Sequence, residues 1–355
     1  MKNKLWILGI ILSFAVMLAS CGGSKGGTTI TTGVVTTLAG IAGNPGSLDA
    51  TGTAATFHTP YGIATVGTSL FVADTGNSTI RKIDIASGLV STLTGSAGAS
   101  GSTDGTVTAA LFYAPGGITT DGTNLYVADT GNNTIRKIDI ASGLVSTLTG
   151  SAGVSGSTDG TGTSATFNLP FGITTDGTNL YVADTGNSTI RKIDIASGLV
   201  SVSTMTVTDA TTGTAATFHT PYGIATDGTS LFVADTGNNT IRKIDIASGV
   251  VTAFVGTAGV SGSTDGTGAA ASFNHPAGIT IDGTILYVSD TGNNTIRKVI
   301  ISSGVVTTLA GIAGNPGSLD ATGTAASFAR PVGISSSGSI LYVADTLNST
   351  IRKIQ

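Results

Sequence analysis

LYVADTGNNTIRK, residues 125–137, is the stretch that decides the fold, because close copies of it recur along the chain. Its aspartate stands at Asp74, Asp129, Asp184, Asp235, Asp290 and Asp345, so the successive spacings are 55, 55, 51, 55 and 55 residues. A fixed period of this length indicates a repeat architecture, in which each repeat packs on its neighbours. The chain therefore contains six tandem copies of one structural unit.

Each copy contains four runs with strand composition, separated by turn-forming residues. In the second copy these runs are 117–120, 125–128, 134–140 and 144–149. Between them lie Asp-Gly-Thr-Asn, Thr-Gly-Asn-Asn and Ala-Ser-Gly, which favour tight turns. Four short antiparallel strands per repeat, present six times, predict an all-β, six-bladed β-propeller.

An identical segment at two places predicts how the ring closes. Residues 33–55 read GVVTTLAGIAGNPGSLDATGTAA, and residues 304–326 repeat them letter for letter. The earlier copy has the sequence of a fourth strand, and residues 350–354 form a third strand with no fourth strand after it. We expect the N-terminal strand to complete the last blade. An open solenoid is the alternative, but no capping repeat is visible.

Composition excludes several classes of protein. Of the 355 residues 40% are apolar, 10% are charged and 52 are Gly; every acidic residue is Asp. Helix formers are scarce, so we expect no long helix after the leader. The net charge of −4 argues against a nucleic-acid partner. A single cysteine, Cys21, excludes internal disulfides. We expect a monomeric propeller.

The first residues have the features of an exported bacterial lipoprotein. Lys2 and Lys4 precede an apolar run over 5–18, which is typical of a signal peptide. Leu-Ala-Ser-Cys at 18–21 resembles a lipobox, in which Cys21 becomes lipidated after cleavage. We therefore expect a signal peptide over 1–20, a lipidated cysteine and flexible tether over 21–32, and the propeller over 33–355. An ordinary secretory signal is the alternative. Gly22 after the cysteine favours the outer membrane or cell surface.

The repeat resembles the NHL family. Pro-x-Gly-Ile at 170–173, Leu-Tyr-Val-Ala-Asp at 180–184 and Asn-x-x-Ile-Arg-Lys at 187–192 match its pattern. The resemblance implies a propeller whose first strands line the channel and whose fourth strands form the rim. The Thr-Gly-Asn turns and the long Gly/Ser/Thr loops would share one face, called the top face. The tether would enter from the opposite, bottom face, so a lipid anchor would present the top face outward.

Most of the repeated polar residues have a structural interpretation. The pairs from Asp74 and Arg81 to Asp345 and Arg352 occur in every blade, whereas a single active site would break the symmetry. A second set of aspartates lies in the top loops, and we expect turn stabilisation there, with calcium binding as the alternative. This second set is Asp49, Asp104, Asp159, Asp209, Asp265 and Asp320.

The features that break the symmetry are the candidate ligand-binding residues. Aromatic and polar side chains at a concave mouth suit a small ligand or an extended peptide, although packing of the blade junctions is the alternative. These residues are His58, Tyr61, Phe171, His219, Tyr222, His275 and Arg330. NHL-type amidating lyases bind zinc through channel histidines placed just after the strand-opening proline. This chain has Tyr61, Gly116, Phe171, Tyr222, Ala277 and Val332 there.

The function we expect is therefore binding rather than catalysis. The propeller would be anchored at the cell envelope and would recognise a protein, a glycan or another envelope component through its top face. We name no catalytic residue, metal ligand or cofactor. The alternatives are a metal-assisted hydrolase or lyase with a site at the three histidines, and a structural surface-coat protein.

Overall fold

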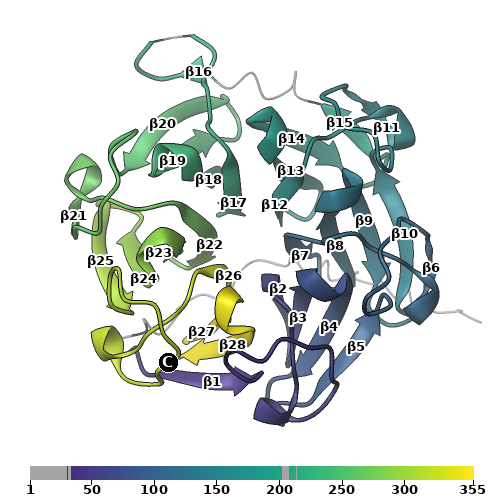
Figure 1. The fold of residues 1–355 in the computed structure, drawn as a ribbon. Helices are drawn as coiled ribbons and strands as arrows, with labels where there is room; N and C mark the ends of the chain where they lie inside the picture. The colour runs from purple at the N-terminus through teal and green to yellow at the C-terminus, as the bar shows by residue number, and fades with distance from the viewer. Residues whose placement is uncertain (1–29, 31–32, 202–207, 213) are drawn as a thin grey trace, which may run out of the picture.

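The computed structural model describes residue 30 and residues 33–201, 208–212 and 214–355. Six β-sheets are arranged like the blades of a propeller around a central axis (Figure 1). Within these residues the only helices are single turns of 3-10 helix. The prediction of an all-β, six-bladed propeller is confirmed. The signal peptide predicted over 1–20, Cys21 and, apart from Ile30, the tether over 21–32 lie outside the described residues.

Blades 1 to 3 follow the predicted four-strand plan, from the innermost strand outward. Blade 1 contains β2 (Pro60–Val66), β3 (Ser69–Asp74), β4 (Thr79–Asp84) and β5 (Val90–Thr94). Blade 2 contains β7 (Ile118–Thr120), β8 (Asn124–Asp129), β9 (Thr134–Asp139) and β10 (Leu144–Thr149). Blade 3 contains β12 (Pro170–Thr175), β13 (Asn179–Asp184), β14 (Thr189–Asp194) and β15 (Leu199–Ser201).

Blades 4 to 6 repeat the plan. Blade 4 contains β17 (Pro221–Thr226), β18 (Ser230–Asp235), β19 (Thr240–Asp245) and β20 (Val250–Val255). Blade 5 contains β22 (Pro276–Asp282), β23 (Ile285–Asp290), β24 (Thr295–Ile300) and β25 (Val305–Ala310). Blade 6 contains β26 (Pro331–Ser337), β27 (Ile340–Asp345), β28 (Thr350–Ile354) and, outermost, β1 (Val35–Ala39).

The strand β1 comes from the other end of the chain and pairs antiparallel with β28, with Val35 opposite Ile354. The innermost strands β26 and β2 of blades 6 and 1 also lie side by side. A side-chain hydrogen bond marks all six junctions between blades, because a turn threonine donates to the carbonyl of the next blade's proline. At the junction of blades 6 and 1, Thr346 Oγ1 lies 2.8 Å from the oxygen of Pro60. The other five bonds measure 2.6 to 2.7 Å.

Four blades carry a short fifth strand that the repeat pattern did not reveal. The connection into each of these blades pairs with the outermost strand before it turns inward to the axis. The extra strands are β6 (Gly105–Thr106), β11 (Gly160–Thr161), β16 (Thr208–Asp209) and β21 (Gly266–Thr267). In blade 4 the pairing is parallel rather than antiparallel, and the connection into this blade is four residues shorter than the one into blade 3.

Single turns of 3-10 helix occupy two positions in the repeat. One set follows the buried aspartate at the top of each blade: η2 (Thr75–Asn77), η4 (Thr130–Asn132), η6 (Thr185–Asn187), η7 (Thr236–Asn238), η9 (Thr291–Asn293) and η11 (Thr346–Asn348). The other set lies in the connections between blades: η1 (Gly52–Ala54), η3 (Val107–Ala109), η5 (Gly162–Ser164), η8 (Gly268–Ala270) and η10 (Gly323–Ala325).

A glycine in each innermost strand allows the blades to approach one another at the axis. A Cβ atom on Gly278 would lie 1.8 Å from the carbonyl oxygen of Val332 in the next blade. A Cβ atom on Gly333 would lie 1.9 Å from the oxygen of Tyr61. Only a residue without a side chain fits this backbone contact. The Gly of each Pro-x-Gly-Ile sequence is therefore a requirement of the ring.

The hydrophobic core lies between neighbouring blades. Tyr126 and Ile135 of blade 2, for example, pack in one cluster with Leu180 and Val182 of blade 3. Strands that are buried on both faces need apolar residues at consecutive positions, and this explains the Leu-Tyr-Val-Ala runs. Each blade is thus stabilised by the one beside it.

Ile30 packs beside the bottom hairpin of blade 5. It is buried in the hydrophobic cluster that contains Ile285 and Tyr287 of blade 5 and Leu341 of blade 6. Ile30 therefore lies in a cluster formed by residues of these two blades. Within the described part of the chain, no helix is long and apolar enough to cross a membrane.

Candidate functional site

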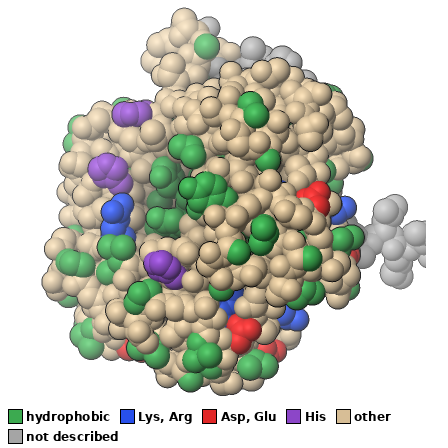
Figure 2. All heavy atoms as spheres, turned by 45° about the vertical axis from the view of Figure 1, so that its right-hand side comes forward, with side chains coloured by type: hydrophobic (Ala, Val, Ile, Leu, Met, Phe, Trp, Pro, Cys, Tyr) green, Lys and Arg blue, Asp and Glu red, His purple; other side chains and the backbone are tan. Residues whose placement is uncertain are grey.

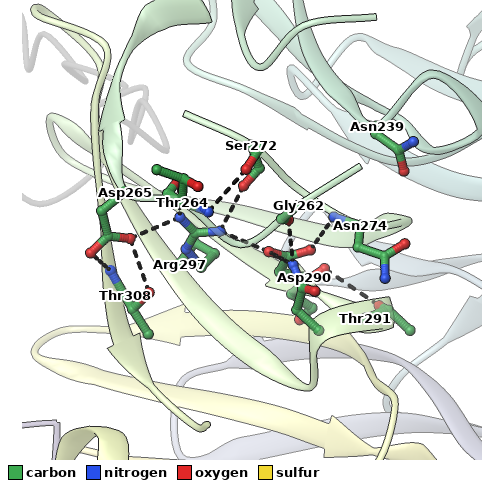
Figure 3. Close-up of polar contacts among 12 residues, drawn as sticks. Asn239, Gly262, Thr264, Asp265, Ser272, Asn274, Asp290, Thr291, Arg297 and Thr308 are labelled. Atoms are coloured by element: carbon green, nitrogen blue, oxygen red, sulfur yellow. Dashed lines mark hydrogen bonds and ion pairs between the residues drawn. The ribbon is translucent and has the colours of Figure 1, made fainter. Parts of the chain in front are cut away.

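Each blade has an arginine that joins two aspartates, and in five of the six blades it is buried, as blade 5 shows (Figure 3). Arg297 makes ion pairs of 2.8 Å with Asp290 and with Asp265. The guanidinium also donates to the carbonyl oxygens of Ser272 and Thr264, each at 3.0 Å, and its carbon lies 5.1 Å from the centre of the Phe273 ring. This network joins the inner hairpin to the loop that enters the blade.

The buried aspartate of this network also holds the top turn. The carboxylate of Asp290 accepts hydrogen bonds from the backbone N–H of Asn274 and from the side chain of Asn293, both at 2.8 Å. Burial raises the pKa of Asp290, although these donors and Arg297 oppose the rise. The outer aspartate, Asp265, accepts from both the backbone and the hydroxyl of Thr308. The oxygens of both carboxylates are therefore occupied by protein donors.

Blade 4 holds its arginine more loosely than the others. Arg242 lies 3.5 Å from Asp235 and 3.1 Å from Asp209, and 11% of its side chain is exposed, against 0% for the other five. Its carbon lies 5.6 Å from the centre of the Phe218 ring. The shortened connection that carries Asp209 explains the difference, because it brings the loop onto the blade along a different path.

A small cavity lies on the axis at the top end of the innermost strands. The cavity measures about 70 Å³ and is lined by the innermost strands of all six blades, mainly by their Gly and Ile residues. Tyr61 carries the only ionisable side chain of this lining. Sites for drug-sized ligands measure about 300–1,000 Å³. A ligand of that size would therefore lie on the mouth of the channel rather than inside it.

Three of the predicted site residues form an aromatic cluster at this mouth. The ring centres of Tyr61 and Phe171 are 5.4 Å apart in an edge-to-face arrangement, and those of Phe171 and Tyr222 are 4.5 Å apart. All three side chains are partly exposed. The cluster forms because Phe171 leans over Gly116 of blade 2, where a Cβ atom would lie 2.9 Å from its ring. Figure 2 shows hydrophobic side chains gathered at the central hollow of this face.

A β-bulge directs these side chains. In blade 1 the register of the first two strands shifts between Pro60 and Ile63, so Tyr61 and Gly62 leave the regular ladder. The same shift occurs in blades 3 and 4. Bulges redirect a side chain without ending the strand. Tyr61, Phe171 and Tyr222 can therefore face the axis while the glycine that follows each of them contacts the next blade.

Arg330 belongs to this site. Burial, followed by the neighbouring Tyr61, raises the pKa of Tyr222, and the charge of Arg330 opposes the rise. Arg330 is exposed, and it is the one arginine of the described chain that makes no ion pair.

The three histidines are exposed but do not form a metal site. His58 and His219 each pack on the turn glycine of their own blade, Gly76 and Gly237. His275 lies one residue further along the repeat, and its Nδ1 is 2.8 Å from the side-chain oxygen of Asn274. Within the described residues no group of three His, Cys, Asp or Glu side chains is arranged to hold a metal. Figure 2 shows histidine side chains around the central hollow rather than inside it.

Differences among the six repeats concentrate around one proline. All six copies share the Pro-x-Gly-Ile framework, but the positions beside the proline vary. Two residues before it stand His58, Tyr113, Asn168, His219, Asn274 and Ala329. Immediately before it stand Thr59, Ala114, Leu169, Thr220, His275 and Arg330. Immediately after it stand Tyr61, Gly116, Phe171, Tyr222, Ala277 and Val332, which include the aromatic cluster. The top mouth is thus a surface on which the six blades differ from one another.

The residue before each proline adopts a left-handed backbone conformation, which the sequence did not reveal. Its φ lies between 46° and 50° in all six blades. A non-glycine residue held in this way costs about 1–3 kcal/mol, and such strain is common at binding sites. In blades 3, 5 and 6 an asparagine of the preceding blade supports it: Asn133, Asn239 and Asn294 accept the N–H of Leu169, His275 and Arg330 at 2.8 Å.

The residue that accepts this backbone N–H is asparagine where the residue before the proline is large, and serine where that residue is small. Ser78 and Ser188 stand at the same turn position as the asparagines, and they contact the N–H groups of Ala114 and Thr220 at 3.4 Å. The backbones of Leu169, His275 and Arg330, whose side chains are exposed, are thus held by the shorter hydrogen bonds. Alternation of Thr-Gly-Asn-Asn with Thr-Gly-Asn-Ser was the signal in the sequence for this support.

Fold and site together define a six-bladed β-propeller with an asymmetric aromatic mouth. No protein-family model matches the chain. It is 30% identical over 296 residues to the human NHL repeat-containing protein 2, an alignment that covers 71% of this chain and 40% of that protein. The chain therefore spans about two fifths of this relative's length. The similarity and the six-bladed fold support an NHL-type propeller.

Solved structures share the fold at low sequence identity. A protein of unknown function from Bacteroides thetaiotaomicron superposes with a TM-score of 0.71 at 20% identity, covering 90% of this chain and 75% of that one. An auxiliary nutrient binding protein from the same organism superposes with a TM-score of 0.63 at 17% identity, covering 91% and 76%. At these identities the likeness establishes the fold alone.

Proposed function

We propose that this protein is a binding propeller that recognises a protein, a glycan or another envelope component through the top mouth of its channel. The observation that carries the proposal is the concentration of repeat differences at that mouth. The strands of the blades are close copies of one another, whereas at the mouth aromatic, basic and small residues replace one another. A surface with a purely structural role would keep the repeated residue.

The chemistry of the mouth supports binding over catalysis. Partly exposed aromatic rings supply apolar contact area, and the strained residues before the prolines hold polar groups beside it. The cavity lining offers no carboxylate, imidazole or amine for proton transfer. The auxiliary nutrient binding protein of the same fold is consistent with a binding role.

The lipid anchor at Cys21 is part of the proposal, together with a location at the outer membrane or cell surface. Ile30 supports the orientation, because it contacts the bottom of blades 5 and 6. A chain that leads from a membrane anchor to this contact would direct the top face, with its mouth, away from the membrane. Protease protection of the top loops in intact cells would contradict this orientation.

The test is capture of a ligand from envelope extract by the full chain, immobilised in mild detergent. The paired substitution Phe171→Ala and Tyr222→Ala removes most of the aromatic cluster, and we expect capture to be lost. Leu144→Ala, an exposed apolar residue on the outermost part of blade 2, is the matched control. Capture that survives the paired substitution, or that fails equally in the control, would contradict a mouth-centred function.

The hydrolase or lyase alternative requires a metal at the histidines. Elemental analysis of the purified chain tests it directly. Stoichiometric zinc that is lost on substitution of His58 and His219, or a calcium-dependent activity, would replace binding by catalysis as the proposed function. If the protein were a structural surface coat, substitutions at the mouth would leave ligand capture unchanged.

A further inference from the structure

We propose that the mouth binds the C-terminal carboxylate of a peptide whose last residue is apolar. This inference rests on the proposed function and specifies its ligand. The mouth is divided between two kinds of side chain. Blades 1, 3 and 4 contribute the aromatic cluster, whereas blades 5 and 6 contribute His275 and Arg330 next to the small residues Ala277 and Val332. Figure 2 shows hydrophobic side chains at the hollow and basic side chains beside it.

The positive charge of Arg330 favours an anionic ligand group on this side of the mouth. Every other arginine of the chain is paired with two aspartates, so Arg330 is the available guanidinium. No aspartate lines the cavity beside it. Arginine binds carboxylates through two parallel hydrogen bonds, which gives both strength and orientation. An exposed, unpaired arginine at a concave mouth is therefore suited to a carboxylate.

His275 supplies a second polar group on the same side. Its Nδ1 lies 2.8 Å from the side-chain oxygen of Asn274, and this contact orients the ring. The Nε2 atom is then directed away from this bond. Asn239 and Asn294 hold the backbones of His275 and Arg330, each at 2.8 Å. The backbones of both residues are thus fixed before a ligand arrives, which reduces the entropy lost on binding.

The apolar side of the mouth favours a hydrocarbon side chain over a sugar. Its cavity of about 70 Å³ has the volume of roughly two water molecules in the liquid. The lining consists of Gly, Ile, Ala, Val and aromatic residues, so a buried sugar hydroxyl would find only the Tyr61 hydroxyl as a side-chain partner beside the backbone groups. The aromatic rings also meet edge-to-face or tilted, and so do not form a flat platform. An apolar side chain fits both the volume and the lining.

The test uses the full chain in detergent and a pool of random octapeptides, prepared once with free C-terminal carboxylates and once as C-terminal amides. We expect the free-acid pool to be retained with enrichment of apolar last residues, and the amidated pool to pass through. Arg330→Gln should weaken binding of an enriched peptide about 10- to 100-fold, the range for a hydrogen bond to a charged group. Equal retention of both pools, or of neither, overturns the proposal.

Positioning variants separate this inference from the function on which it rests. Asn294→Ser should weaken binding of the acid peptide, because it removes the 2.8 Å support of Arg330. Asn133→Ser, which loosens Leu169 in the same way, is the matched control and should have less effect. If capture depends on Phe171 but is indifferent to Arg330→Gln, the carboxylate assignment fails and the mouth remains the binding site. If oligosaccharides that bear uronic acids bind through Arg330 and peptides do not, the peptide assignment is wrong.

Discussion

Replacing the buried arginine of one blade by methionine tests the network of Figure 3. In blade 5, Arg297→Met removes two 2.8 Å ion pairs and two carbonyl hydrogen bonds, and it leaves Asp290 fully buried. Breaking a buried pair from one side costs about 3–5 kcal/mol. Methionine retains the packing on Phe273, so the loss reports mainly the unpaired charge.

Blade 4 provides a matched control within the same molecule. Arg242 lies 3.5 Å and 3.1 Å from its two aspartates, and it is partly exposed. Asp235 is fully buried in blade 4 as well, but its ion pair with Arg242 is longer, so Arg242→Met should cost less than Arg297→Met. Urea unfolding followed by circular dichroism gives the free energy of unfolding of both variants. If the two substitutions lower the free energy of unfolding by amounts that agree within about 0.5 kcal/mol, the distances between arginine and aspartate do not determine the cost of removing the arginine.

The pH dependence of the blade 5 variant gives a second measure. Without Arg297, the carboxyl of Asp290 keeps the N–H of Asn274 and the amide of Asn293 but has lost its counter-charge. Burial already raises the pKa of this carboxyl. Protonation at acid pH therefore removes the buried charge. The loss in free energy of unfolding that Arg297→Met causes should become smaller as the pH falls. A deficit that stays constant with pH would refute the assignment of the cost to an unpaired carboxylate.

Three further predictions concern the ring, the buried aspartates and the leader. Gly333→Ala places a Cβ atom 1.9 Å from the oxygen of Tyr61 and should lower the free energy of unfolding by about 3 kcal/mol or more, as overpacking of backbone does. Gly67→Ala, which has open space but a φ of 54°, should cost only about 1 kcal/mol, and equal losses would contradict the contact. Burial raises the pKa of Asp345 from 3.8 to about 6, so the folded state keeps a proton that the unfolded state loses. The thermal unfolding midpoint should therefore decrease as the pH is raised from 4 to 6, and Asp345→Asn should make this decrease smaller. A midpoint that increases over the same interval would contradict the raised pKa. Cys21→Ser should move the protein from the detergent phase to the aqueous phase in a cloud-point separation, and a wild-type chain already in the aqueous phase would exclude the lipid.

The repeat alone predicted the blades because its information is local. Asp290 and Arg297 lie seven residues apart on the two sides of one hairpin, so their pairing follows from the strand register. Turn residues, apolar runs and the Pro-x-Gly-Ile framework recur with the period, and a structure built from such units has few alternatives. The number of blades, their antiparallel order and the structural role of the buried pair were therefore predictable.

The tertiary structure decided which side chains meet. The symmetry-breaking residues were recognisable in the sequence, but the contact of Phe171 with both Tyr61 and Tyr222 depends on the bulge that directs each ring and on the empty space above Gly116. The same geometry keeps His58 and His219 on their own turns. Contacts across the axis join residues from different repeats, and their distances depend on the radius of the ring rather than on spacing along the chain. The sequence by itself thus determined the propeller, and the assembled ring determined its mouth.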